Sequence, residues 1–216
     1  MNLIKQLIAV AAVATMGFTA TAQAAEAPDA LVKRISEDVI NTAKADKDIQ
    51  SGNQQKIMAL VETKILPYVD SNRMTALAAG RFWRQATPEQ QKALSEQFRT
   101  LLVYTYSGAL SQIKNETITF KPMRADAADT DVEVRSQVNM TRGDPVLLNY
   151  RVAKAGDSWK IYDINVMGAW LVETYKGTFT SEINKGGIDG LIKTLADKNK
   201  SLASKPLKAN PATPAK

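Results

Sequence analysis

Residues 131–166 read DVEVRSQVNMTRGDPVLLNYRVAKAGDSWKIYDINV, and the pattern of this segment predicts a β-sheet. Asp131–Thr141 alternates apolar and polar side chains with the period of two that is typical of a half-buried strand. Two more strands are predicted at Pro145–Ala153 and Ser158–Val166, and each of the turns between the three strands contains a Gly-Asp pair. Because short turns join antiparallel neighbours, we expect the three strands to form a meander.

The segments before this meander and after it are predominantly helical. Thr117–Met123 shows a shorter alternation and supplies a fourth strand. Elsewhere, apolar residues recur at helical spacing. The predicted helices are Pro28–Asp48, Gln54–Leu66, a short helix from Asp70 or Ser71 through Ala79, Pro88–Lys114, Met167–Asn184 and a last helix after Gly186-Gly187. Helices and strands that are segregated along the chain in this way indicate an α+β fold.

The first 24 residues have the three parts of a secretory signal peptide. Lys5 follows the terminal amine, Leu7–Ala20 is apolar, and Ala22-Gln-Ala24 has small residues at both recognition positions for cleavage. The apolar run is shorter than the roughly 20 residues that a transmembrane helix needs. We therefore predict cleavage after Ala24 and a periplasmic protein. The mature chain is expected to be a single domain over 25–198, followed by a disordered tail over 199–216 that is rich in Lys, Ala and Pro.

The composition excludes several classes of function. With no Cys and no His, the chain has no disulfide framework, no Cys- or His-ligated metal and no imidazole for proton transfer. Asp126, Asp129 and Asp131 lack the spacing of a calcium loop, and Gly186–Gly190 lacks the ending of a phosphate-binding loop. The formal charge of +6 is scattered rather than gathered in a basic stripe, so nucleic-acid binding is not predicted. We expect no cofactor, no metal and no enzymatic activity.

The apolar side chains of the predicted sheet form one broad surface beneath the helices. They can belong to an ordinary packed core, or they can leave an apolar cavity for a ligand between the sheet and the helices. Periodicity does not distinguish these two arrangements.

Several short segments of the chain are informative when they are taken together, in their order and spacing. They are Ile65–Asp70, Ala78–Gln85, Ala86–Gln90 with Phe98, Tyr106–Leu110, Trp159–Asp163 and Gly187–Leu191. This set resembles the MlaC family of periplasmic phospholipid carriers, also called the toluene-tolerance family. The resemblance extends from about Pro28 to Lys198.

The resemblance implies a twisted four-stranded antiparallel sheet wrapped by about six or seven helices, related to the cystatin/NTF2-like architecture. It implies a deep apolar cavity for acyl chains, with the headgroup near the mouth. The implied function is a carrier rather than an enzyme. It would shuttle phospholipid between an outer-membrane lipoprotein (MlaA-like) with its porin and an inner-membrane ABC transporter that carries an MCE protein (MlaD-like), and so maintain outer-membrane lipid asymmetry. A carrier of hopanoids or another apolar ligand, and a periplasmic adaptor with a solid core, are the alternatives.

If the resemblance holds, inward-facing residues of the sheet and of the neighbouring helices line the cavity. Met140 is included as an adaptable filler. An Arg or Lys near the mouth would contact the headgroup, although the sequence does not select one. The predicted ligand-binding residues are Phe98, Leu102, Tyr106, Val134, Val138, Met140, Leu148, Tyr150, Val166 and Trp170.

Overall fold

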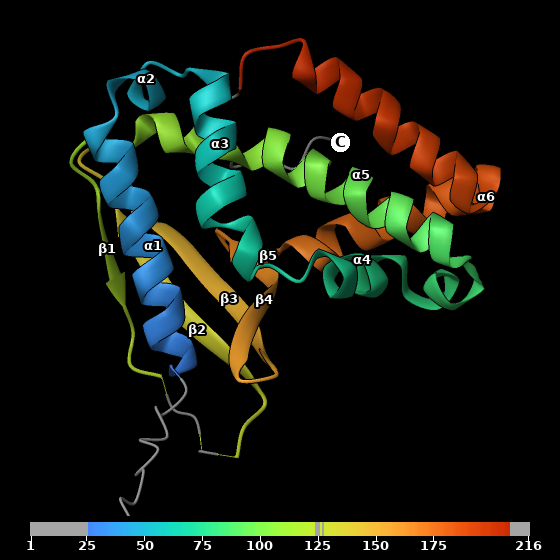
Figure 1. Cartoon of the computed structure of the whole chain (residues 1–216), viewed down its shortest axis with the longest axis horizontal. Coiled ribbons are helices and arrows are strands. Elements are labelled where there is room, and N and C mark those ends of the chain that lie inside the picture. The colour runs from blue at the N-terminus through green and yellow to red at the C-terminus, as the bar shows by residue number, and fades with distance from the viewer. Residues whose placement is uncertain (1–25, 124–125, 127, 208–216) are drawn as a thin grey trace, which may run out of the picture.

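The computed structural model describes residues 26–123, 126 and 128–207 (Figure 1). The predicted signal peptide and the end of the predicted tail lie outside these residues. The α-helices are α1 (Pro28–Ala45), α2 (Lys47–Gln50), α3 (Gln54–Lys64), α4 (Ser71–Ala79), α5 (Pro88–Tyr106) and α6 (Leu171–Ala203), and the 3-10 helices are η1 (Leu66–Tyr68), η2 (Gly80–Gln85) and η3 (Ser107–Gln112). The strands are β1 (Thr117–Phe120), β2 (Asp131–Asn139), β3 (Val146–Ala155), β4 (Ser158–Val166) and β5 (Ala169–Trp170). The predicted α+β class is confirmed.

The strands form one antiparallel sheet in the order β1-β2-β3-β4-β5. The four longer strands are those predicted from the sequence. The fifth strand corrects the prediction of four: β5 is two residues long, too short for alternation to reveal, and it pairs with Asn165 and Val166. Elsewhere along β4, Val69 pairs with Ile161 in a parallel bridge, so the segment after η1 is joined directly to the sheet.

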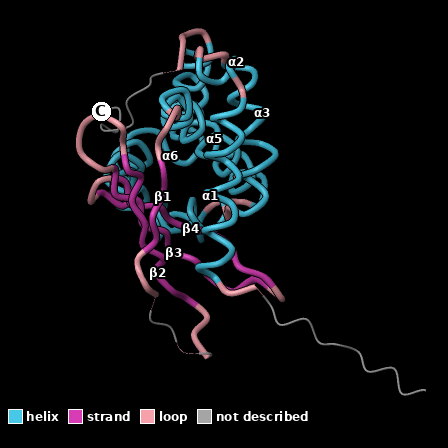
Figure 2. The backbone as a smooth tube through the Cα atoms, turned by 90° about the vertical axis from the view of Figure 1, so that its left-hand side faces the viewer, coloured by secondary structure: helices cyan, strands magenta, loops and turns pink. Residues whose placement is uncertain are grey.

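One face of the sheet is apolar and the other is largely polar. The register pairs Val134 with Tyr150 and Tyr150 with Ile164, which places these three side chains on the same face. Glu133 and Arg151 are also paired, and they lie on the opposite face. Figure 2 shows most of the helices stacked to one side of the strands. The amphipathic alternation of the strands therefore determines which face of the sheet α1, α2 and α3 cover.

The buried apolar side chains form two separate clusters rather than one core. The first, here called the sheet cluster, contains residues of α1, α2, α3, β2, β3 and β4, among them Leu31, Ile57, Val134, Val152 and Ile161. The second, here called the helix cluster, contains residues of α4, α5 and α6, among them Met74, Leu94, Phe98, Phe179 and Leu191. Figure 1 shows the elements of the sheet cluster on the left and those of the helix cluster on the right. The two clusters thus divide the described part of the molecule into a sheet half and a helix half.

The start of α5 agrees with the prediction from the sequence, but its end does not. Thr87 and Gln90 form the predicted capping box, with Pro88 in the first turn. The predicted helix to Lys114 is too long, because α5 ends at Tyr106 and continues as η3. Tightening to 3-10 geometry redirects the chain from the helix cluster to the sheet cluster, where Leu110 packs.

The C-terminal helix also differs from the prediction at both ends. It begins at Leu171, because Met167 and Gly168 have positive φ values and turn the chain from β4 into β5. The predicted break at Gly187 is confirmed by a φ of 69° inside α6. The tail was predicted to begin after Lys198, yet α6 runs to Ala203, because buried Asn199 bonds to Gln97 of α5.

Candidate functional site

The structure brings the predicted sheet residues together on the apolar face. Val134 and Tyr150 are buried inside the sheet cluster, and Leu148 packs against its edge. Val138 and Val166 are half-buried farther along the same face, paired with Val146 and Leu148 respectively. The far end of this face is therefore less completely covered than its centre.

The three predicted residues on α5 point to two different environments. Phe98 is 1% exposed and packs edge-to-face against Tyr175 and Phe179, with ring centroids 5.0 and 4.8 Å apart. The structure thus places Phe98 inside the helix cluster and not with the sheet residues. Leu102, one turn later, is only half-buried at the edge of that cluster, and so is Tyr106 at the end of the helix.

Trp170 also lies apart from the predicted sheet residues. It pairs with Asn165, so its side chain lies on the polar face of the sheet, and Arg151 lies over its ring at 4.1 Å from the centroid. The strand alternation that places Val166 on the apolar face places Trp170 on the other one. Met140 follows the end of β2 and is half-buried, outside the ladder.

Polar contacts fasten the helix cluster to the polar face of the sheet. The Asp163 side chain is fully buried and accepts hydrogen bonds from the Val172 N–H at the start of α6 (3.1 Å) and from Arg151 (3.3 Å). Burial raises the pKa of Asp163 despite these bonds. From α4, Arg73 bonds to Asp131 at 2.7 Å and lies over the Tyr162 ring at 3.6 Å. These contacts hold α4 and α6 against β4.

A cleft of about 510 Å³ opens between the two halves of the molecule. One wall comes from α5, and the other comes from η1, the start of α4 and the β3–β4 hairpin. Its lining residues are Leu66, Val69, Asp70, Ser71, Asn72, Lys92, Ser95, Glu96, Arg99, Ala155 and Lys160. None of the predicted ligand-binding residues is among them, although Ser95 and Arg99 flank Phe98 on α5. The volume is within the range of small-molecule sites.

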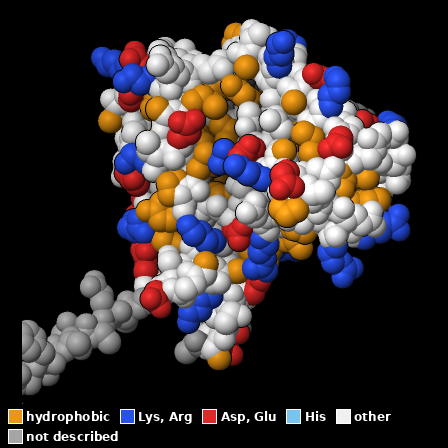
Figure 3. Space-filling model, turned by 45° about the vertical axis from the view of Figure 1, so that its right-hand side comes forward, with side chains coloured by type: hydrophobic (Ala, Val, Ile, Leu, Met, Phe, Trp, Pro, Cys, Tyr) orange, Lys and Arg blue, Asp and Glu red, His pale blue; other side chains and the backbone are white. Residues whose placement is uncertain are grey.

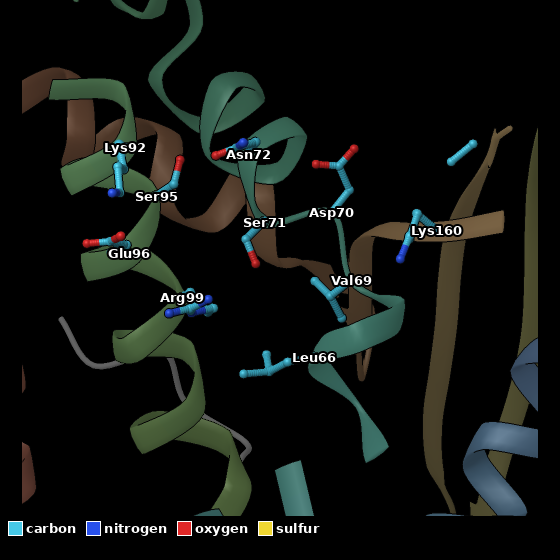
Figure 4. A pocket seen from close by; sticks show the side chains of 11 residues that line it. Leu66, Val69, Asp70, Ser71, Asn72, Lys92, Ser95, Glu96, Arg99 and Lys160 are labelled. Carbon is cyan, nitrogen blue, oxygen red and sulfur yellow. The ribbon is translucent and has the colours of Figure 1, made fainter. Parts of the chain in front are cut away.

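The cleft is amphipathic. Figure 4 shows Leu66, Val69 and Ser71 extending into it from one side and Arg99 facing them from α5. Lys160 donates a hydrogen bond to the Pro67 carbonyl, which holds the ammonium group beside η1. Figure 3 shows apolar side chains in a hollow on one face of the molecule, with charged side chains beside it. An amphipathic ligand matches both kinds of lining.

A buried hydroxyl group lies in the cleft. The Ser95 hydroxyl has no hydrogen-bond partner among the described residues. Farther along α5, burial and the neighbouring Tyr175 raise the pKa of Tyr106. A buried hydroxyl without a partner carries a desolvation cost of about 1–3 kcal/mol, which a bound polar group can offset.

The described residues lack the features of a metal site or of a membrane-spanning helix. No group of three or more acidic side chains among them is arranged to hold a metal ion. None of the helices in the described part of the chain has both the length and the apolar character needed to cross a bilayer. The cleft offers a ligand apolar contact, hydroxyl groups, positive charge and the two carboxylates of Asp70 and Glu96.

Sequence reasoning missed the residues that line the cleft. Leu66, Val69 and Asp70 belong to the Ile65–Asp70 segment that carried the family resemblance, but their role was not inferred. Lys92 and Arg99 are candidates for the unspecified cation near the mouth. Their positions in α5 fit an exposed helix face equally well, so no sequence signal separated them from ordinary surface residues.

Comparisons with known proteins agree on one family. The model of the family described as "MlaC protein" matches residues 33–197. The toluene tolerance protein ttg2D of Pseudomonas putida is 25% identical over 167 residues, 77% of each chain. The intermembrane phospholipid transport system binding protein MlaC of Haemophilus influenzae is 24% identical over 192 residues, 88% of each chain.

A solved structure is more similar in sequence. The phospholipid-binding protein from Ralstonia solanacearum, determined in complex with a phospholipid, is 50% identical to this chain and superimposes with a TM-score of 0.77. The match covers 82% of this chain and 98% of that one.

Proposed function

Because the chain belongs to the MlaC family, we propose that it is a phospholipid carrier of the periplasm. The observation that carries the proposal is the 50% identity to a protein solved with a phospholipid bound. The amphipathic cleft between the sheet cluster and the helix cluster supports it independently, since a phospholipid has both apolar chains and a charged headgroup.

The physical reason for such a carrier is the cost of exposing acyl chains to water. A phospholipid has roughly 30 methylene groups, each worth about 0.8 kcal/mol when buried. Release of a free lipid into water therefore costs on the order of 20 kcal/mol, and unassisted crossing of an aqueous compartment is negligible. A protein that buries the chains removes most of this barrier.

We place the acyl chains where the two halves meet, beyond the cleft. Residues already buried in one of the clusters, such as Phe98 and Val134, have their packing partners and gain little from a ligand. The half-buried members of the predicted set retain apolar surface that a chain can cover. The proposed lining is therefore Leu102, Tyr106, Val138, Met140, Leu148 and Val166.

We propose the finer parts of the function on the basis of the family and the sequence. After cleavage at Ala24, a single lipid-binding domain over 25–198 would receive lipid from one membrane complex and deliver it to the other. An outer-membrane lipoprotein with its porin and an inner-membrane MCE protein with its ABC transporter are the proposed partners. The chain acts by binding rather than by catalysis, and the transporter supplies any energy.

Mass spectrometry on the gently purified mature protein, native and after organic extraction, tests the proposal. We expect a phospholipid in stoichiometric amount. A polycyclic apolar molecule in its place would assign the protein to the hopanoid alternative. A protein that stays empty after incubation with lipid vesicles and its membrane partners would refute the carrier and favour a solid-core adaptor.

A further inference from the structure

We propose that the cleft holds the phosphate group of the lipid headgroup, between the Arg99 side of α5 and the first turn of α4. The inference rests on the proposed carrier function and goes further, because it assigns the recognised chemical group and the residues that recognise it. Its elements are a cationic helix wall, a helix N-terminus with free donors and a buried hydroxyl without a partner.

The cationic wall is formed by successive turns of α5. Lys92 and Arg99 both line the cleft, and their spacing of seven residues places them on one face of the helix. Neither forms an ion pair with a described carboxylate. Across the cleft, Lys160 is held beside η1 by its bond to the Pro67 carbonyl. An anion that enters the cleft therefore meets positive charge on both sides.

The first turn of α4 supplies neutral donors. The helix is nine residues long, and the Asp70 carboxylate already accepts from the Arg73 N–H at 2.9 Å. The N–H groups of Ser71 and Asn72 have no acceptor among the described residues. Helix N-termini with free N–H groups bind phosphate readily. The Ser71 side chain extends into the same space (Figure 4).

An independent observation comes from Ser95, which lies on α5 between Lys92 and Arg99. Its side chain lines the cleft, yet the residue is only 5% exposed and the hydroxyl lacks any hydrogen-bond partner among the described residues. A buried hydroxyl of this kind is expected to have a partner. A phosphate or ester oxygen in the cleft would supply it.

The two carboxylates in the cleft do not cancel this preference. Asp70 is engaged in capping α4, and in Figure 4 its carboxylate extends away from the space between Arg99 and Val69. Glu96 extends away on the other side of α5 from that space. The cleft residues therefore retain an excess of one positive charge, with Arg99 directed inward. The planar fork of an arginine can bind two phosphate oxygens at once.

The cleft favours a lipid phosphate over a free one because Leu66 and Val69 lie beside the polar groups. A free phosphate would leave these apolar side chains in contact with water, whereas the first part of an acyl chain would cover them. The two sources share the same phosphate chemistry, so the experiment has to separate them.

The test compares two lipids that differ in the phosphate. Lipid-stripped protein is incubated with detergent micelles that contain equal amounts of dioleoylphosphatidic acid and dioleoylglycerol, and the bound ratio is measured by mass spectrometry. We expect the wild-type protein to prefer the phosphate-bearing lipid. Arg99→Gln should lower this preference about tenfold, the equivalent of about 1.4 kcal/mol, while total bound lipid is retained.

Two variants serve as controls. Arg84→Gln removes an exposed arginine that is outside the cleft and should leave the ratio unchanged. Glu96→Gln removes a negative charge from the same wall and should raise the preference. A change in the same direction for Arg99→Gln and Glu96→Gln would contradict an electrostatic origin.

The remaining outcomes separate this inference from the carrier function. Equal binding of both lipids by the wild-type protein would refute the phosphate site and leave the carrier intact, whereas binding of neither lipid would refute both. Titration with inorganic phosphate addresses the other source. If it binds the lipid-free protein in an Arg99-dependent manner while the lipid ratio stays insensitive to Arg99, the site serves free phosphate and the headgroup assignment is wrong.

Discussion

Phe98 and Leu102 lie one turn apart on α5, and their truncation should separate stability from ligand binding. Phe98 belongs to the closed helix cluster, whereas Leu102 is half-buried beside the proposed path of the acyl chains. We predict that Phe98→Ala lowers the stability of the lipid-free protein strongly and that Leu102→Ala lowers it weakly. Lipid retention should respond in the opposite order.

The magnitudes follow from what each side chain touches. A buried Phe truncated to Ala costs about 3–5 kcal/mol, because contacts are lost and a cavity remains. Two edge-to-face ring contacts, with Tyr175 and Phe179, place Phe98 toward the upper end of this range. A fully buried Leu costs about 2–5 kcal/mol, so half-buried Leu102 should cost about 1–2 kcal/mol.

Urea denaturation of the lipid-stripped variants measures the first quantity, and the molar ratio of extracted lipid to protein measures the second. Because Phe98→Ala can lose its fold, Phe98→Leu provides a milder change at the same site. We expect Phe98→Leu to keep a normal lipid ratio and Leu102→Ala to reduce it. A folded Phe98→Leu protein that loses its lipid, beside a Leu102→Ala protein that keeps it, would refute the assignment of these residues.

Three further predictions concern other parts of the molecule. Leu148→Asp places a charge on the half-buried part of the apolar sheet face and should abolish lipid retention. A folded variant that still copurifies with a normal amount of lipid would exclude Leu148 from the cavity lining. Burial alone would raise the pKa of Glu116, but hydrogen bonds from the Lys114 N–H and the Thr141 hydroxyl outweigh it and lower that pKa. The stabilisation is therefore present above the ordinary pKa of a glutamate and is lost as the pH falls through the lowered pKa. Glu116→Gln should flatten the acid limb of a stability-versus-pH curve, and an unchanged limb would contradict the coupling. Met167 is 50% exposed and has a φ of 52°, a backbone conformation that Asn tolerates better than Met. Met167→Asn should therefore relieve about 1 kcal/mol of strain and raise the midpoint of thermal unfolding. A lower midpoint would mean that the hydrogen bond from the Leu147 N–H to the Met167 sulfur contributes more than the strain costs.

Much of the secondary structure could be predicted because its signals are local. The alternation in β2, β3 and β4, the capping box at Thr87 and the break at Gly187 each depend on a few neighbouring residues. The errors arose where tertiary contacts override such signals. Asn199 extends α6 through a bond to Gln97, and the two-residue strand β5 exists only because β4 offers a partner.

The candidate site was predicted less well than the fold. Hydrophobic patterning marks residues as buried, but it does not say in which cluster they are buried, and Phe98 and Val134 are in different ones. Patterning also groups Trp170 with the apolar residues of the sheet, whereas the strand register places its side chain on the polar face. The cleft itself is built from η1, α4, α5 and a hairpin, which are far apart in the chain.

Four properties could be inferred from the amino-acid sequence: the α+β class, the antiparallel meander, the absence of Cys and His chemistry, and the resemblance to the MlaC family. These properties depend on the order and the period of residue types, which a chain carries before it folds. The folded structure was needed to reveal that the apolar residues divide into two clusters and that Arg99 faces the first turn of α4 across a cleft. The reason is that burial of apolar surface is non-directional, so patterning specifies that side chains are covered, while packing between distant elements specifies what covers them.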